Sequence, residues 1–376
     1  MNNPFVTNGY AGPEYFCDRV EETDFLVRML TNENNVALIS PRRIGKTDLI
    51  RHCFEQATIK EHYHTFVVDV YSTQNLQDFV NVFGRAILEG LRSKGRSAWE
   101  LFLQVVASLR TEVSFDINGM PVWSISLGTI ASPIVTLDEI FQYLNKADLR
   151  CLVAIDEFQQ ITNYEDGTNV EAALRTYIQR CPNANFIFSG SHRHLMGDIF
   201  TSPSRPFYQS VTIFNLKPIA MDKYMAFASD KFERAGKHLA EDVVPTLYQR
   251  FHSTTAYIQK VMNYMYQITN RDGTCTISFI DEAINYILDI SSDTYEGLLY
   301  QMPDKQKKVF IAIATEREAK GISGGRFAKK YKLVSPSSVV SAVKGLLEKD
   351  FITQDKGAYY VYDKLFQLWL EREHRL

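Results

Sequence analysis

The sequence predicts an α/β core built on a parallel β-sheet, followed by a helical segment and a C-terminal winged helix-turn-helix. Three observations support this fold class. Short apolar runs alternate with amphipathic helical segments as far as about Leu216. Two of these runs are followed by polar motifs, Gly45-Lys46-Thr47 in one case and Asp156-Glu157 in the other. The end of the chain has the pattern of three helices and two strands.

Length and composition favour a folded protein of several domains. The chain has 376 residues, of which 45% are hydrophobic and 23% are charged, values that are typical of globular proteins. We expect domains at residues 1–216, 217–294 and 295–376. No apolar run approaches the roughly 18 residues of a membrane span, and the N-terminus lacks the pattern of a signal peptide. We therefore expect a cytoplasmic protein with no membrane partner.

The cysteines and histidines disfavour disulfide-rich and zinc-binding proteins, and the distribution of charge bears on a nucleic-acid partner. The five cysteines are scattered and form no Cys-x-x-Cys pair, which disfavours a disulfide framework and a zinc site. The histidine pairs His62/His64 and His192/His194 lack further ligands. Residues 296–376 carry 15 Lys/Arg and 10 Asp/Glu, whereas the whole chain has a net charge of −3. A basic C-terminal part permits a nucleic-acid partner without requiring one.

Five apolar runs rich in Val, Ile and Phe are predicted as strands that are covered on both faces. They are residues 36–40, 65–71, 151–155, 185–189 and 211–216. Between the second and third runs, apolar residues recur at helical spacing and predict an amphipathic helix. They are Leu76, Phe79, Val80, Phe83 and Ile87.

The remaining elements lie in an insertion and in the C-terminal half. Residues 113–117 and 122–127 flank Asn118-Gly119, which predicts a hairpin insertion at about 111–130 on the edge of the sheet. Residues 221–290 are helical in pattern, without a strong strand signal. The helices predicted next are 305–315, 325–331 and 337–349. The strands that follow, 351–354 and 359–362, flank Lys356-Gly357 and complete a winged helix-turn-helix.

Gly45-Lys46-Thr47 lies between a predicted strand and a predicted helix. Backbone N–H groups and the positive end of such a helix can surround a phosphate group. Lys46 can reach the β- and γ-phosphates, and the Thr47 hydroxyl can coordinate Mg²⁺. Ser40 stands where the first glycine of this motif is expected. The sequence therefore predicts a P-loop that departs from the usual pattern at its first position.

Asp156-Glu157 directly follows the apolar run 151–155. Ligands of open α/β sheets collect at the carboxyl ends of the strands, so we expect Asp156 to lie close to Lys46. Asp156 can hold Mg²⁺ directly or through a water. Glu157 can polarise the water that attacks the γ-phosphorus. Together the two motifs predict a P-loop NTPase core whose cofactors are ATP and Mg²⁺.

Four stretches resemble the archaeal-type ATPase branch of the AAA+/STAND group, a branch that also occurs in bacteria. They are residues 15–22, with an aromatic residue before Asp-Arg; 40–47, with Pro-Arg-Arg before Gly-Lys-Thr; 155–159; and 186–193 with Met196. The resemblance covers nearly the whole chain, since that group also has a helical lid and a C-terminal winged helix. It implies an AAA+-like core at 1–216, a lid at 217–294 and a winged helix at 295–376.

The resemblance also implies roles for individual residues. The nucleotide-binding residues would be Asp18, Arg19, Pro41, Arg42, Arg43, Ile44, Gly45, Lys46, Thr47 and Asp48. Asp18 and Arg19 belong to the motif that lies over the adenine. The metal ligands would be Thr47 and Asp156. The catalytic residues would be Glu157, Lys46, Arg193 and Arg205.

Three of these assignments have alternatives in the sequence. Ser191 or Arg193 could read the γ-phosphate, but Gly190-Ser191 is equally a tight turn. Arg205 is a candidate arginine finger, because negative charge develops on the γ-phosphoryl group; it is equally an exposed loop arginine. Arg42 and Arg43 could contact phosphate, a neighbouring subunit or only solvent.

The predicted winged helix leaves its partner open. Its third helix is serine-rich, with Lys344 and Lys349 as its cations, so specific base readout from it is weak. Basic residues gather in the preceding stretch and would suit phosphate contacts with DNA. They are Arg326, Lys329, Lys330 and Lys332. The alternative is a module that contacts protein or packs on the ATPase core.

Two functions follow from these features. The first is an enzyme that hydrolyses Mg-ATP slowly, with turnover that depends on a partner, and that moves the lid and winged helix. The second is a nucleotide-gated DNA- or protein-binding switch with negligible turnover. A kinase is disfavoured because no acceptor-site motif is visible. A finger acting from a neighbouring subunit would need a homo-oligomer, which Arg205 alone does not establish.

Overall fold

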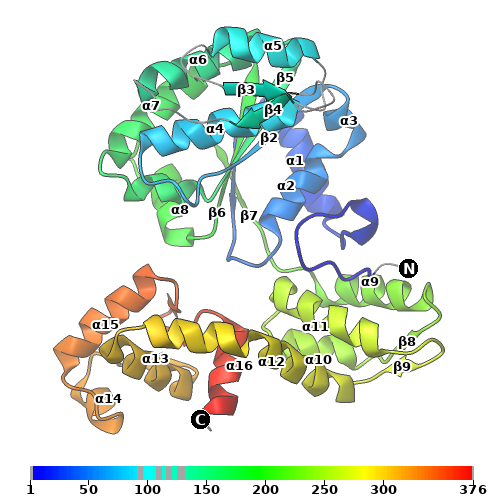
Figure 1. Ribbon diagram of the computed structural model, residues 1–376, viewed down its shortest axis with the longest axis vertical. Coiled ribbons are helices and arrows are strands. Elements are labelled where there is room, and N and C mark those ends of the chain that lie inside the picture. The colour runs from blue at the N-terminus through cyan, green and yellow to red at the C-terminus, as the bar shows by residue number, and fades with distance from the viewer. Residues whose placement is uncertain (1–2, 92–95, 107–111, 116–120, 125–131, 375–376) are drawn as a thin grey trace. The chain divides into compact units, whose positions relative to one another are not determined.

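The computed structural model describes residues 3–91, 96–106, 112–115, 121–124 and 132–374 (Figure 1). The chain divides into two compact units. The core unit is Asn8–Lys223. The C-terminal unit is Tyr224–Leu376, and it also takes in the N-terminal segment Met1–Thr7.

A five-stranded parallel sheet lies at the centre of the core unit, with the strand order β2-β5-β6-β1-β7. Its strands are β1 Val36–Ile39, β2 Tyr63–Asp69, β5 Arg150–Asp156, β6 Ala184–Gly190 and β7 Thr212–Asn215. Each strand ends within two residues of the bounds predicted from its apolar run. The predicted α/β fold with a parallel sheet is therefore confirmed.

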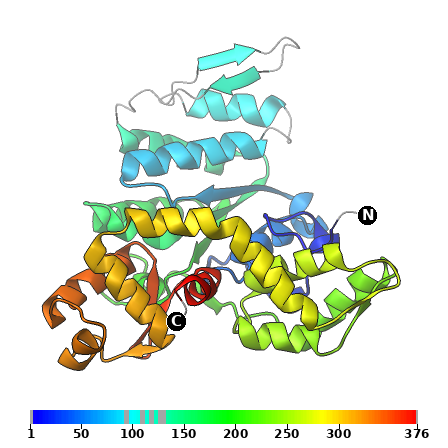
Figure 2. The ribbon, with the colours of Figure 1, turned by 60° about the horizontal axis from the view of Figure 1, so that its bottom comes forward.

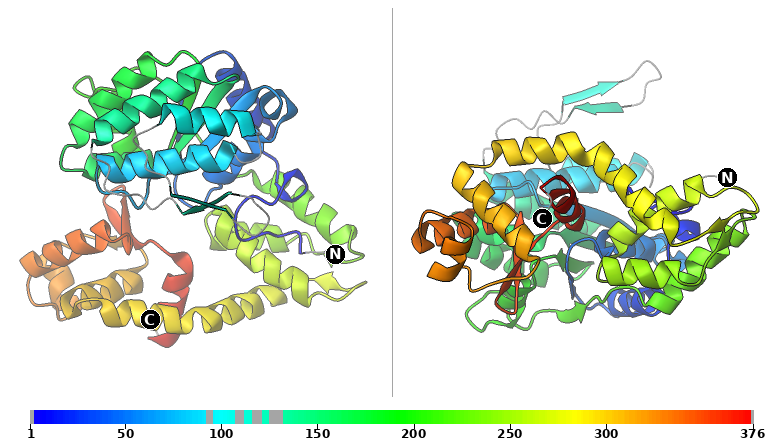
Figure 3. Two further views of the ribbon diagram at one scale, coloured as in Figure 1. Left: turned by 45° about the horizontal axis from the view of Figure 1, so that its top comes forward. Right: turned by 90° about the horizontal axis from the view of Figure 1, so that it is seen from below.

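Helices cover both faces of this sheet (Figures 1 and 3). They are α1 Val20–Thr31, α2 Lys46–Phe54, α3 Ala57–Lys60, α4 Leu76–Leu91, α5 Arg96–Val105, α6 Pro133–Lys146, α7 Gly167–Gln179 and α8 Arg193–Thr201. Val36 and Leu38 of β1 pack into one buried cluster with α1 and α2, while Ala37 and Ile39 pack into a second cluster with α4, α6 and α8. This division explains why the strands are apolar throughout, since successive side chains point to opposite, equally covered faces.

A separate hairpin is inserted between α5 and α6 and projects from the core unit (Figure 2). Its strands, β3 Glu112–Phe115 and β4 Pro121–Ser124, pair antiparallel with each other in a two-stranded sheet of their own. The predicted turn Asn118-Gly119 lies outside the described residues.

Helices dominate the first part of the C-terminal unit. They are α9 Met221–Glu233, α10 Val243–Arg250, α11 Thr255–Ile268 and α12 Ser278–Gln301. α12 runs through residue 294, where the sequence analysis places a domain boundary. Two short strands, β8 His238–Leu239 and β9 Thr274–Cys275, pair parallel. The sequence analysis missed them because two-residue strands show no alternating pattern.

The rest of the C-terminal unit is the predicted winged helix, which is confirmed. Its helices are α13 Asp304–Glu316, α14 Gly325–Lys330, α15 Pro336–Glu348 and α16 Lys364–Glu373, and its strands are β10 Ala319–Lys320, β11 Ile352–Asp355 and β12 Ala358–Val361. The strands form an antiparallel sheet in the order β10-β12-β11, of which the sequence analysis missed β10. Lys356 and Gly357 both have positive φ, as a two-residue hairpin turn requires.

The hydrophobic packing of α16 ties the winged helix to α12. The ring of Tyr295 on α12 stacks on Phe366 of α16, with centroids 4.6 Å apart. The indole of Trp369 donates a hydrogen bond to the Ser292 hydroxyl at 3.0 Å. Among the described helices, none combines the length and the hydropathy that crossing a membrane requires.

Candidate nucleotide site

The P-loop leads from the end of β1 to the first residue of α2. Ser40 is buried, and its backbone N–H donates to the carbonyl of Gly190 on β6. Arg43 and Gly45 both have positive φ. Gly45 directly precedes α2, and its left-handed backbone is a conformation that glycine adopts without steric cost. The serine at the first position therefore sits in sheet-like surroundings, where no glycine is needed.

Lys46 begins α2 and is only 6% exposed. Burial lowers the pKa of Lys46, the carboxylates of Glu157 and Asp156 oppose that change, and Arg42 adds to it. The Lys46 ammonium group is largely desolvated and lies near two carboxylates, so it is well placed to bind phosphate oxygens.

Thr47 and Asp156 are in direct contact. The Thr47 hydroxyl donates a hydrogen bond to Asp156 Oδ2 at 2.5 Å. The two residues belong to α2 and to the carboxyl end of β5, so this bond brings the two predicted motifs together. A hydroxyl and a carboxylate side by side are hard oxygen ligands of the kind that Mg²⁺ prefers.

Glu157 follows β5 in the left-handed region, with φ of 55°. Its Oε2 accepts hydrogen bonds from Gln159 Nε2 at 2.5 Å and from the Ser191 hydroxyl at 2.7 Å. Burial raises the pKa of Glu157, but these two hydrogen bonds and the charges of Lys46 and Arg42 outweigh that effect and lower it overall. Glu157 is thus held as a carboxylate in a fixed orientation.

Arg42 reaches the same cluster from the P-loop. Its Nε donates to the Ser191 hydroxyl at 3.2 Å, and its guanidinium lies 5.4 Å from the centroid of the Tyr71 ring. Of the two residues predicted to read the γ-phosphate, Ser191 therefore lies beside Glu157. Arg193 is exposed at the first residue of α8 and takes no part in these hydrogen bonds.

Arg19, which the resemblance places among the nucleotide-binding residues, binds backbone groups of the core unit. Its guanidinium is 2% exposed and donates to the backbone carbonyls of Ile44 at 3.2 Å and Lys217 at 2.7 Å. It also pairs with Glu22 at 2.7 Å. In the structure Arg19 therefore holds the P-loop by its backbone, a position that the sequence pattern could not reveal.

The other predicted nucleotide-binding residues surround the loop. Pro41 and Arg43 are exposed, whereas Ile44 is buried beneath the loop. Asp48 lies in the first turn of α2, where burial raises its pKa, Arg51 opposes that change and Asp156 adds to it. Asp18 precedes Arg19 and, like it, has a positive φ.

Arg205 is engaged within the core unit. Its guanidinium lies 2.5 Å from Glu171 Oε1 and 3.6 Å from Asp198 Oδ2. Glu171 is fully buried at 0% exposed. Burial raises the pKa of Glu171, and the Arg205 charge opposes that change. A finger role would require this pair to open and would leave a buried carboxylate without its partner.

Two polar residues at the site were missed by the sequence analysis. Asp69 ends β2 and lies opposite Asp156 in the parallel register. Burial raises its pKa, the Tyr71 backbone N–H opposes that change, and the charges of Asp156 and Glu157 add to it. The available signal was a lone aspartate close to the carboxyl end of the predicted strand 65–71. Gln159, which holds Glu157, lies in the family-like stretch 155–159, but the sequence analysis gave it no role.

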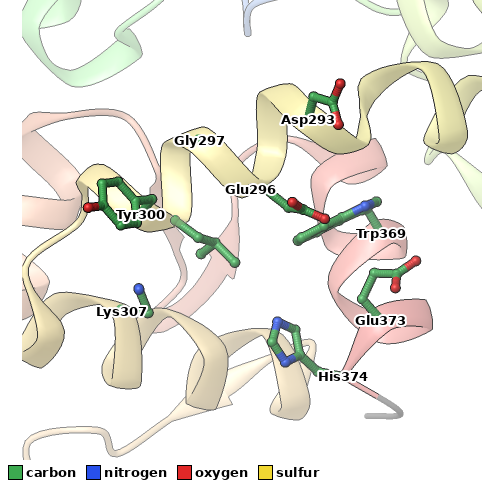
Figure 4. A pocket seen from close by; sticks show the side chains of 9 residues that line it. Asp293, Glu296, Gly297, Tyr300, Lys307, Trp369, Glu373 and His374 are labelled. Carbon is green, nitrogen blue, oxygen red and sulfur yellow. The ribbon is translucent and has the colours of Figure 1, made fainter.

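A cavity in the C-terminal unit is unrelated to this site. It has a volume of about 630 Å³ and lies between α12, α13 and α16 (Figure 4). Its lining residues are Asp293, Glu296, Gly297, Leu299, Tyr300, Lys307, Trp369, Glu373 and His374. None of them is a predicted site residue.

A family model described as an ATPase domain predominantly from Archaea matches residues 16–261, which include every residue of the site described above. The chain belongs to this ATPase family. The family that the sequence resembles is thereby confirmed. A second model, described as a probable winged helix domain, matches residues 293–372.

Solved structures with a similar fold include proteins of Pyrococcus abyssi and Aeropyrum pernix. The Walker-type ATPase PABY2304 of Pyrococcus abyssi is 16% identical with a TM-score of 0.65, and the match covers 98% of this chain and 99% of that one. The ORC2 protein of Aeropyrum pernix, in ADPNP and ADP complexes, is 13% identical with a TM-score of 0.58 and coverage of 100% and 99%. The ORC1 protein of Aeropyrum pernix, in complex with DNA, is 12% identical with a TM-score of 0.56 and coverage of 96% and 95%.

These structural matches show the fold of this family member and no more. The comparison with curated proteins finds no match.

Proposed function

We propose that the chain binds Mg-ATP at the P-loop, hydrolyses it slowly in the cytoplasm, and uses the cycle to move the lid and the winged helix. The observation that carries the proposal is the hydrogen bond of 2.5 Å between Thr47 and Asp156. This bond joins α2, the helix that follows the P-loop, to the carboxyl end of β5, where the two carboxylates lie. Membership of an ATPase family supports the same activity.

Lys46 and the N-terminus of α2 bind the phosphates in this proposal. The backbone N–H groups of the loop and the helix end attract negative charge. The pKa of Lys46 is lowered by burial, so a triphosphate that brings negative charge to the ammonium group would favour its charged form. ATP binding would thereby restore the pKa of Lys46 toward its ordinary value.

Thr47 and Asp156 would hold Mg²⁺. In nucleotide sites Mg²⁺ takes one or two protein ligands and completes its shell with phosphate oxygens and water. Among the described residues, no group of three or more His, Cys, Asp or Glu side chains could hold a metal by itself, which fits a site that the nucleotide completes. When bound, Mg²⁺ would neutralise charge on the phosphates.

Glu157 would orient the attacking water. The two hydrogen bonds that the Glu157 carboxylate accepts from described residues both fall on Oε2, so we assign Oε1 to the water. The lowered pKa keeps this carboxylate ionised at neutral pH, the form in which it accepts a hydrogen bond from water most strongly. Of the two alternatives for sensing the γ-phosphate, Ser191 or Arg193, we propose Ser191, which acts through its hydrogen bond to Glu157.

The second candidate function is a nucleotide-gated binding switch with negligible turnover. Exposed cations on and after α14 favour a nucleic-acid partner, since Arg326, Lys329 and Lys332 all face solvent. Double-stranded DNA is the first partner to test, because ORC1 of Aeropyrum pernix was solved with DNA. A protein partner for the winged helix is the alternative. Assembly into a homo-oligomer enters the proposal only if an arginine finger acts between subunits.

Phosphate release by the purified protein, with and without DNA, separates the two functions. We expect Mg-dependent release of phosphate from ATP, and we expect Glu157→Gln to abolish it while ATP binding is kept. Glu165→Gln is the matched control, since Glu165 is an exposed carboxylate of the same unit. Intact ATP binding without turnover under any of these conditions would overturn the enzymatic proposal in favour of the switch.

A further inference from the structure

The first residues of the chain dock into the C-terminal unit, although the residues that follow them belong to the core unit. Phe5 is 0% exposed. Its ring lies 6.0 Å from the ring of Phe227, 5.7 Å from that of Phe232 and 5.7 Å from that of Tyr266, measured between centroids. These partners belong to α9 and α11 of the predicted lid.

Two asparagine side chains fix the backbone of this segment. Asn3 Nδ2 donates to the Asn263 carbonyl at 2.7 Å, and Asn263 Nδ2 donates to the Phe5 carbonyl at 2.7 Å. The Phe5 N–H donates to Asn3 Oδ1 at 3.0 Å. The segment is therefore held in the lid both by a buried ring and by reciprocal hydrogen bonds.

The chain then passes through three exposed residues and docks on the P-loop helix. Thr7, Asn8 and Gly9 are exposed. The Tyr10 hydroxyl then lies 2.9 Å from His52 Nδ1, and the Phe16 ring stacks on the His52 ring with centroids 4.2 Å apart. His52 belongs to α2, the helix that begins with Lys46 and Thr47. The segment that leaves the lid is thus attached to the element that carries the phosphate-binding residues.

Arg19 completes this attachment. Asp18 and Arg19 are consecutive non-glycine residues with positive φ, a strained backbone that persists only where the surroundings impose it. The buried guanidinium of Arg19 binds the Ile44 carbonyl inside the P-loop and the Lys217 carbonyl. Lys217 lies just before the second passage of the chain into the C-terminal unit, which comes after Lys223.

We propose that Arg19 is a positioning residue that couples the lid to the P-loop. The first connection to the C-terminal unit runs through the segment that leads to Arg19, and the Arg19 guanidinium binds the carbonyl of Lys217, which lies shortly before the second connection, and that of Ile44 in the P-loop. The inference rests on the proposed ATP site and concerns its regulation. A displacement of either connection would alter the hydrogen bond to the Ile44 carbonyl, next to Gly45 and Lys46. The conformation of the lid then changes the affinity of the P-loop for ATP. By linkage, ATP binding changes the equilibrium between lid conformations by the same factor.

A flexible insertion tests the coupling without removing either anchor. A Gly-Ser segment of about six residues, inserted between Thr7 and Asn8, would make the first connection between the two units longer and more flexible. We expect the inserted protein to keep its melting temperature but to bind ATP at least about fivefold more weakly, since couplings between sites are typically about 5- to 150-fold. The same segment inserted between Lys356 and Gly357 in the exposed wing is the control and should leave ATP affinity unchanged.

Arg19→Lys identifies the residue that transmits the effect. Lysine keeps the charge, but its ammonium group lacks the planar fork with which arginine binds two carbonyls. We expect Arg19→Lys to weaken ATP binding, and we expect the insertion to cause no further loss in that background. Additive losses would show that Arg19 acts independently of the lid and would overturn its role. The control is Arg28→Lys, which changes an exposed arginine of α1, the helix that Arg19 directly precedes.

Isothermal titration of Mg-ATP separates failure of this inference from failure of the proposed function. If the unmodified protein binds no ATP, the proposed function fails and the coupling fails with it. If the unmodified protein binds ATP and the inserted protein binds it equally well, the proposed function stands and the coupling is overturned.

Discussion

Ser191 joins two charged groups of the candidate site. Its hydroxyl donates to Glu157 Oε2 at 2.7 Å and accepts from Arg42 Nε at 3.2 Å. The three residues follow β6, β5 and β1, which are neighbours in the sheet. One hydroxyl therefore connects the P-loop to the carboxylate that we assign to the attacking water.

Loss of that hydroxyl should slow hydrolysis more than it weakens binding. A hydrogen bond to a charged group contributes about 1.5–3 kcal/mol. Each 1.4 kcal/mol changes a rate about tenfold, so we expect Ser191→Ala to lower kcat about 10- to 100-fold. The affinity for ATP should change little, because the phosphate-binding groups of Lys46 and α2 stay in place. Steady-state phosphate release and ATP titration measure the two quantities.

Two further variants define the Ser191 experiment. Ser191→Thr keeps a hydroxyl and should recover most of the turnover. Ser210→Ala removes a serine hydroxyl that donates to the Phe207 carbonyl and is not one of the site residues, and it should leave turnover unchanged. Unchanged or faster hydrolysis by Ser191→Ala would show that the serine does not orient Glu157 for the reaction.

The sheet and the winged helix could be predicted because their signals are local. Strands such as 151–155 are continuous apolar runs, and a sheet covered on both faces requires such runs. β8, β9 and β10 have only two residues each, too few for a periodic pattern. The sequence analysis missed them for that reason.

The site could be predicted in part. Lys46, Thr47, Asp156 and Glu157 follow predicted strands, and the carboxyl ends of parallel strands share one edge. The positions of Arg19 and Arg205 could not be predicted. They depend on partners far away in the sequence, since Arg19 binds Lys217 over 198 residues and Arg205 binds Glu171 over 34 residues.

Lys46→Met should abolish ATP binding while raising the stability of the protein. Burial lowers the pKa of Lys46, so the folded state disfavours its charge more strongly than water does. The charge therefore costs stability at every pH below the lowered pKa. The cost falls as the pH rises from that pKa toward 10.5, the ordinary lysine value, because the folded state then releases the proton.

Urea unfolding from pH 7 to pH 10 tests whether the charge of Lys46 lowers the free energy of unfolding. Lys46→Met should have a higher free energy of unfolding than the unmodified protein at pH 7, and the gap should narrow toward pH 10. Lys60→Met is the control, because Lys60 is an exposed lysine on α3 and should show no such gap. A Lys46→Met protein that is less stable at pH 7 would contradict the prediction.

Arg205→Ala should destabilise the core unit through Glu171. Removal of one partner of a buried ion pair leaves the other charge without compensation and costs about 3 kcal/mol. Arg205 is 19% exposed, while its partner Glu171 is fully buried, so most of the cost lies with the carboxylate. The free energy of unfolding measures this loss, and Arg193→Ala, which removes an exposed arginine, should cause little change.

The double variant Arg205→Met with Glu171→Leu distinguishes an ion pair from an arginine finger. Replacing both members of a buried pair with apolar side chains of similar size is often neutral for stability, so we expect the double variant to regain most of the lost free energy. If Arg205 acts only through Glu171, the folded double variant should hydrolyse ATP at the same rate as the unmodified protein. An arginine finger contributes about 10³-fold or more to kcat, so a loss of that size in a stable double variant would assign Arg205 to the transition state instead.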